Sequence, residues 1–199
     1  APGHGDRIWH PQDRCGADGC AEEAGGTGYY HYEMDRPGRH RGSGGPEPGR
    51  TPDEIPGVSG GEAAAFDRYY SILPEAATAV KSGGCTMHDA SEGGIFAGLW
   101  EMAEGAGVGL TIDMKKLPLR QETVEVCEYC NVNPYELRSG GSLIIASPEG
   151  TAVVEALVAE GIPAVIVGRF TDSNERLILN EDEVRYMDRP QRDEIYKSV

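Results

Sequence analysis

The residues best suited to chemistry form one short junction between a predicted strand and a predicted helix, His88-Asp89-Ala90-Ser91-Glu92-Gly93-Gly94. Two glycines at a helix start let the backbone approach a ligand closely, and unpaired N–H groups there favour an anion. Asp89 or Ser91 can cap the helix, and Asp89 can also hold a metal ion or orient His88. An ordinary capped turn has the same pattern, and the Gly-Lys-Ser/Thr ending of a P-loop is missing.

The cysteines form a second candidate site. Cys85-x-x-His88 and Cys127-x-x-Cys130 contain the ligand types of a four-ligand zinc site, although the gap between the two pairs is long. Alternatively, Cys127 and Cys130 lie one helical turn apart on a buried face with Thr123 and act as small apolar side chains. A small zinc-stabilised domain therefore remains open beside an ordinary helix.

A third candidate is the small-residue loop Ser139-Gly140-Gly141-Ser142, which leads into a predicted buried strand. Its glycines can bring the backbone close to a ligand. Turn formation explains the same residues equally well.

The elements that must position these residues begin near Glu62, where apolar residues fall into helical and strand periods. Helix and strand then alternate, which predicts an α/β or α+β class. The predicted helices cover 62–80 (with a break or new first turn at Pro74), 95–106, 120–130 and a stretch from an N-cap at Ser147 to Gly161. The predicted strands cover 85–88, 108–112, 143–146, 164–167 and 177–179, the last two joined by a turn at 172–174.

Composition and charge narrow the class of protein. A net charge of −15 argues against nucleic acid, because phosphates require a basic surface. The longest apolar runs of about five residues are far short of the roughly 20 that a membrane-spanning helix needs. Five cysteines are odd in number and too few for a disulfide scaffold, which favours a reducing, cytoplasmic setting.

Three stretches together resemble the C-terminal domain of the aminoimidazole ribonucleotide (AIR) synthase superfamily, and most of all its hydrogenase maturation factor type. They are Thr86-Met87-His88-Asp89-Ala90-Ser91-Glu92-Gly93-Gly94, Leu99-Trp100-Glu101-Met102-Ala103-Glu104 with Gly107-Val108-Gly109, and Ser139-Gly140-Gly141-Ser142-Leu143. The resemblance covers residues 62–199. It implies an α+β fold with a small mixed sheet and helices packed on one side.

The resemblance also implies an ATP-using family. Its members have an N-terminal domain with a glycine-rich strand, the acidic Mg²⁺ ligands and the homodimer interface, and a C-terminal domain that closes over the nucleotide. Carried over by position, the cofactor-binding residues near the phosphates are His88, Asp89, Ser91, Gly93 and Gly94. Ala90 and Glu92 replace the usual proline and arginine, and Gly140 stands where many members have glutamate.

These comparisons lead to one expectation and one alternative. We expect a truncated C-terminal domain that is inactive alone, from a protein that transfers a phosphoryl group from ATP–Mg²⁺ to a carbonyl or carboxyl oxygen. The alternative is a non-catalytic binding module that pairs with a separately encoded N-terminal half.

Residues 1–61 have a different composition from the rest of the chain. They hold 15 of the 28 glycines and 7 of the 13 prolines, and no leucine. Such a segment buries too little apolar surface to offset an ordering entropy of about 1–2 kcal/mol per residue. The composition therefore predicts a disordered Gly/Pro-rich segment.

The genetic code offers a second interpretation of this segment. When the second and third bases of each codon are read with the first base of the next, residues 28–41 are compatible with D-I-I-I-T-K-W-I-G-L-E-G-T-A. That peptide has strand-like composition and resembles the family segment just before this domain. We hypothesise that residues 1–61 are an out-of-frame translation, with the frame regained between Ser59 and Ala63.

The coding DNA tests this hypothesis. The shifted frame should be open throughout codons 1–61. Stop codons in the shifted frame, with an uninterrupted written frame, would contradict it.

Overall fold

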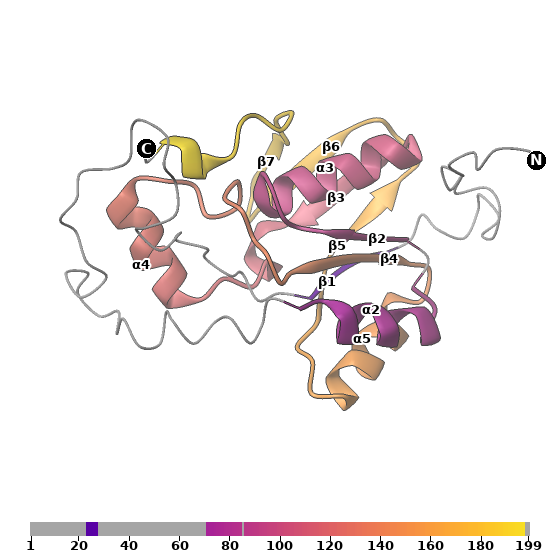
Figure 1. Ribbon diagram of the computed structural model, residues 1–199. Coiled ribbons are helices and arrows are strands. Elements are labelled where there is room, and N and C mark those ends of the chain that lie inside the picture. The colour runs from indigo at the N-terminus through magenta and orange to yellow at the C-terminus, as the bar shows by residue number, and fades with distance from the viewer. Residues whose placement is uncertain (1–22, 28–70, 85, 198–199) are drawn as a thin grey trace, which may run out of the picture.

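Figure 1 shows the chain as a computed structural model that describes residues 23–27, 71–84 and 86–197. The helices are α2 (Leu73–Lys81), α3 (Gly94–Ala106), α4 (Gln121–Cys130) and α5 (Gly150–Ala159), with short 3₁₀ turns η4 (Met114–Lys116) and η5 (Glu194–Lys197). The strands are β1 (Glu23–Thr27), β2 (Thr86–Asp89), β3 (Gly109–Asp113), β4 (Leu143–Ser147), β5 (Val165–Thr171), β6 (Arg176–Asn180) and β7 (Glu183–Tyr186).

The strands form one mixed sheet in the order β2-β4-β1-β5-β3-β6-β7. All its pairs are antiparallel except β3 with β6, which run parallel. The predicted α+β class with a small mixed sheet is therefore confirmed.

Helices cover both faces of the sheet, which corrects the expectation that they pack on one side. Alternate residues of β4 belong to two different cores: Ile144 and Ala146 pack with α3, and Leu143 and Ile145 pack with α2 and α5. Strand side chains alternate between faces, so a strand buried along its whole length needs cover on each side. Among the described residues, no helix has the length and hydropathy needed to cross a membrane.

Most element boundaries follow from local chemistry. Helix α3 ends at Gly107, whose φ of 68° places it in the left-handed region that suits a helix C-terminus. Helix α4 ends in the same way at Asn131, with a φ of 54°. Both ends agree with the predicted ranges 95–106 and 120–130.

One sequence expectation differs from the structure, and one strand was not expected. Ser147 does not cap α5; its hydroxyl accepts from Glu149 N–H at 3.0 Å and donates to the Gly83 carbonyl, and the helix starts at Gly150. The predicted turn at 172–174 does connect β5 to β6, although β3 lies between these two strands in the sheet. Strand β7 was not predicted, since it is only four residues long and exposed along its whole length.

The segment 1–61 lies outside the described residues except for Glu23–Thr27, which form β1 rather than a disordered stretch. This strand pairs with β4 on one side and β5 on the other. Strand pairing uses backbone groups, so it does not require apolar side chains. The out-of-frame origin of the segment stays a hypothesis, and the part of the predicted first helix over 62–70 also lies outside the described residues.

The core on the α3 side predicts a large stability loss for Leu99→Ala. Leu99 is fully buried, so its truncation should lower the free energy of unfolding by about 2–5 kcal/mol. Val158→Ala on α5, where the side chain is 56% exposed, should change it by no more than about 0.5 kcal/mol. Urea unfolding of the two variants measures the difference, and equal losses would contradict this placement of the core.

Candidate functional site

The register of β2 and β4 brings two of the sequence candidates together. These antiparallel strands end with the pair Asp89 and Leu143, so the junction after β2 and the loop before β4 leave the sheet at the same edge. The N–H of Ala90 donates to the Ser142 carbonyl at 3.0 Å, and the N–H of Ser139 donates to the carbonyls of Ala90 and Ser91 at 3.0 and 3.1 Å. The 88–94 junction and the 139–142 loop therefore form one structural unit.

The two glycines of the junction are buried and have left-handed backbones, with φ of 75° at Gly93 and 67° at Gly94. A Cβ on Gly94 would lie 2.5 Å from the Leu137 carbonyl oxygen and 2.6 Å from that of Tyr135. Glycine at position 94 thus allows the first turn of α3 to touch the backbone of the loop after α4. The Phe96 N–H uses this contact and donates to the Tyr135 carbonyl at 3.1 Å.

The amide of Gly93 is not free for an anion, which corrects the expectation of bare N–H groups at this helix start. It donates to Oδ2 of Asp193 at 2.6 Å, and the Gly94 N–H donates to the Ser91 carbonyl at 3.3 Å. The amide is satisfied because the chain supplies its own carboxylate where the helix dipole favours negative charge. Ligand binding by these residues remains a prediction.

The other three predicted site residues lie at the surface beside these glycines. Asp89 and Ser91 are exposed. His88 is half-buried, with Nδ1 lying 2.5 Å from the Asp89 carbonyl oxygen and Nε2 lying 3.0 Å from Oε2 of Glu101 on α3. The imidazole therefore already connects β2 to α3.

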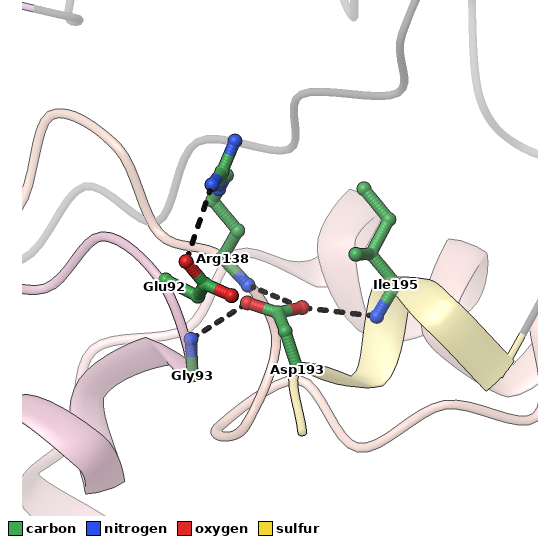
Figure 2. Close-up of polar contacts among 5 residues, drawn as sticks. All are labelled: Glu92, Gly93, Arg138, Asp193 and Ile195. Carbon is green, nitrogen blue, oxygen red and sulfur yellow. Dashed lines mark hydrogen bonds and ion pairs between the residues drawn. The ribbon is translucent and has the colours of Figure 1, made fainter.

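Two residues that the sequence analysis did not single out complete the site. Figure 2 shows Arg138 facing Glu92, and Asp193 beside Gly93. The distance between Nη2 of Arg138 and Oε2 of Glu92 is 3.9 Å. Arg138 precedes the 139–142 loop by one residue, which is the signal that could have drawn attention to it. No local pattern marks Asp193, because its partner Gly93 lies 100 positions earlier.

An aromatic pair supports this end of α3 from the core side. The rings of Phe96 and Tyr135 stack with centroids 5.2 Å apart. Burial raises the pKa of the Tyr135 hydroxyl above its usual value, because the charged phenolate is disfavoured away from water. Tyr135 therefore contributes as a neutral packing residue at neutral pH.

The structure favours the packing interpretation of the second cysteine pair. Cys127 and Thr123 are buried on α4, as expected for small side chains on the inner face of a helix. Within the described ranges, no three His, Cys, Asp or Glu side chains gather in a way that could hold a metal ion. Cys85, the remaining ligand of the zinc alternative, lies outside those ranges.

The fold and the glycine junction have the features expected of an AIR synthase-type C-terminal domain, and a family comparison agrees. The family described as "AIR synthase related protein, C-terminal domain" matches residues 47–180. The match spans more than half of the chain, so the chain belongs to this family. It begins before the predicted boundary at Glu62 and ends before β7.

Curated relatives extend the comparison. The chain is 41% identical to carbamoyl dehydratase HypE of Rhodobacter capsulatus over 113 residues, which covers 54% of this chain and 32% of that protein. It is 32% identical to phosphoribosylformylglycinamidine synthase subunit PurL of Methanopyrus kandleri over 101 residues, which covers 48% of this chain and 13% of that protein. The chain thus matches about a third or less of the length of these relatives.

Solved structures show the same fold. Escherichia coli HypE, a hydrogenase maturation protein, superposes with a TM-score of 0.57 at 23% identity, covering 64% of this chain and 42% of that one. PurL of T. maritima complexed with ATP gives a TM-score of 0.52 at 10% identity, covering 87% and 27%. A HypE structure in complex with ATP gives 0.50 at 17% identity, covering 56% and 37%.

The close approach at Gly94 predicts that Gly94→Ala destabilises the protein more than Gly107→Ala. Both glycines have nearly the same φ, 67° and 68°, so an alanine carries a similar left-handed strain of about 1–2 kcal/mol at each. Only at Gly94 does the Cβ also meet backbone atoms, since nothing lies within 4 Å of a Cβ at Gly107. This overlap should lower the free energy of unfolding by about 1–3 kcal/mol more.

Urea unfolding of the two alanine variants checks this difference. Equal losses would mean that the loop at 135–137 yields freely, and that it does not hold the α3 start in place.

Proposed function

We propose that this chain is the domain of an AIR synthase-related protein that closes over the phosphates of ATP. The observation that carries the proposal is the union of the 88–94 junction and the 139–142 loop at the N-terminal end of α3. Family membership supports it, as do two relatives of the same fold whose structures hold ATP. In this proposal His88, Asp89 and Ser91 lie beside the phosphates, and Gly93 and Gly94 shape the turn beneath them.

The geometry suggests which side chain supplies positive charge to the nucleotide. Glu92 occupies the motif position where an arginine is usual, but Arg138 lies opposite it, with its side chain 40% exposed. A guanidinium binds phosphate oxygens through charge-assisted hydrogen bonds. In this proposal Arg138 takes the place of the missing arginine. Its guanidinium pairs with Glu92 in the absence of nucleotide and binds phosphate oxygens when ATP is bound.

Magnesium enters the proposal together with the nucleotide. Mg²⁺ is usually held by one or two carboxylates, waters and the phosphates themselves. The exposed carboxylate of Asp89 fits that role as one protein ligand. The ion would neutralise charge on the phosphates, and further carboxylates would come from a domain outside the present match.

The reaction proposed for the intact protein is phosphoryl transfer to a carbonyl or carboxyl oxygen, in a homodimer of the family type. Such transfer depends on positioning and on metal ligands, which the family resemblance assigns to the N-terminal domain. The domain alone is accordingly proposed to bind nucleotide without turning it over. A non-catalytic module that pairs with a separate N-terminal half remains the alternative, and nucleotide binding by the chain alone would count against it.

Calorimetric titration of the full chain with ATP, with and without Mg²⁺, tests the proposal. We expect micromolar binding that depends on Mg²⁺. Arg138→Met should weaken it about tenfold, because one charge-assisted contact of about 1.4 kcal/mol is lost. Glu92→Gln should strengthen it, because a carboxylate that competes with phosphate for Arg138 is neutralised.

The matched control is Arg185→Gln on β7, at the opposite edge of the sheet from β2, which should leave the affinity unchanged. Absence of binding at millimolar ATP by folded protein would refute the proposal. Equal effects of the Arg138 and Arg185 variants would show that only overall charge matters.

A further inference from the structure

The Asp193 carboxylate is the most deeply buried charge at the α3 end of the domain. Its residue is only 2% exposed, and three backbone N–H groups donate to its two oxygens. Gly93 donates to Oδ2 at 2.6 Å, while Ile195 and Arg138 donate to Oδ1 at 2.9 and 3.3 Å. A carboxylate so far from water is tolerated only when hydrogen bonds of this kind replace its hydration.

The three donors belong to three different parts of the chain. Gly93 is the N-cap residue just before α3, Arg138 precedes the small-residue loop, and Ile195 lies in η5, two residues after Asp193. One carboxylate therefore fixes the glycine turn relative to the loop that carries the guanidinium. Figure 2 shows this arrangement, with the side chains of Glu92 and Arg138 facing each other beside the same turn.

Gly93 is the N-cap residue of α3, but it has no side chain with which to accept a hydrogen bond from the first turn of the helix. Asp193 supplies the negative charge that the helix dipole favours at this end. Because the carboxylate occupies the Gly93 amide, that amide is unavailable to a phosphate.

We propose that Asp193 is the positioning residue of this site: through the amide of Gly93 and the backbone of Arg138 it aligns the glycine turn and the guanidinium for the nucleotide. The inference rests on the proposed function for its ligand. The family match ends at residue 180, so this contact lies outside what the match describes.

The neighbouring Glu194 provides a control that distinguishes positioning of the glycine turn from anchoring of the C-terminal segment. It is also buried, at 3% exposure, and its Oε2 accepts from the Asn133 N–H at 3.1 Å. It holds the same C-terminal segment against the loop after α4, where its own N–H also donates to the Glu136 carbonyl at 3.2 Å. Glu194→Gln is therefore the matched control for Asp193→Asn.

The experiment uses the full chain and two readouts. Amide hydrogen exchange of the ligand-free protein reports on the turn, and calorimetry with ATP–Mg²⁺ reports on binding. Asp193→Asn should speed exchange at Gly93 and Gly94 at least about tenfold and weaken ATP binding about tenfold. Glu194→Gln should leave exchange over 91–98 unchanged and the affinity within about twofold, even with a similar loss of stability.

Two results would overturn the inference: equal effects of both variants on exchange and affinity, or an unchanged affinity in Asp193→Asn. If the wild-type chain binds no ATP, the proposed function fails. In that case, faster exchange at Gly93 and Gly94 alone in Asp193→Asn would still support positioning of the turn by Asp193. Unchanged exchange at these two glycines would refute it.

A measurement on the wild-type protein covers the case in which Asp193→Asn does not fold. A short hydrogen bond from Gly93 N–H to a carboxylate should move that amide proton well downfield in the NMR spectrum. A resonance position typical of a solvent-exposed glycine would overturn the inference without any variant.

Discussion

A helix whose first turn is buried must find acceptors for its unpaired N–H groups inside the protein, and this requirement organises one end of the domain. Three acceptors meet it at α3: the Asp193 carboxylate for Gly93, the Ser91 carbonyl for Gly94 and the Tyr135 carbonyl for Phe96. They come from the C-terminal segment, the β2–α3 junction and the loop after α4. These three stretches lie together because each satisfies part of the same helix start.

The glycine pair has a structural reason that is independent of any ligand. Gly94 allows backbone contact with residues 135–137 that a Cβ would block, and Gly93 takes the left-handed φ that turns the chain into the helix. The two sequence interpretations, a ligand loop and a capped turn, are therefore not exclusive. The packing that requires glycine also places the exposed Asp89 and Ser91 beside the loop that carries Arg138.

Local signals predicted local structure well. The period of Ile95, Leu99 and Met102 predicted α3 to within a residue at its start, because one helix face must be buried in the core. Alternation predicted β3, and a short apolar run predicted the fully buried β4. The same apolar run did not reveal that helices cover both faces of the sheet. A short apolar run indicates a buried strand but does not indicate which elements cover it.

Contacts between distant residues could not be predicted in this way. Strand β3 lies between β5 and β6 because it pairs with both of them. The turn residues at 172–174 indicate only that two strands are joined there, not which strands pair. Asp193 has no local pattern, and its role exists only because Gly93 is folded against it. Within the motif itself, Glu92 in place of arginine indicates that the positive charge near the phosphates is missing. In the folded protein Arg138 faces Glu92 from another loop. A positive charge therefore lies near this helix start, although it comes from a residue 46 positions later in the sequence than Glu92.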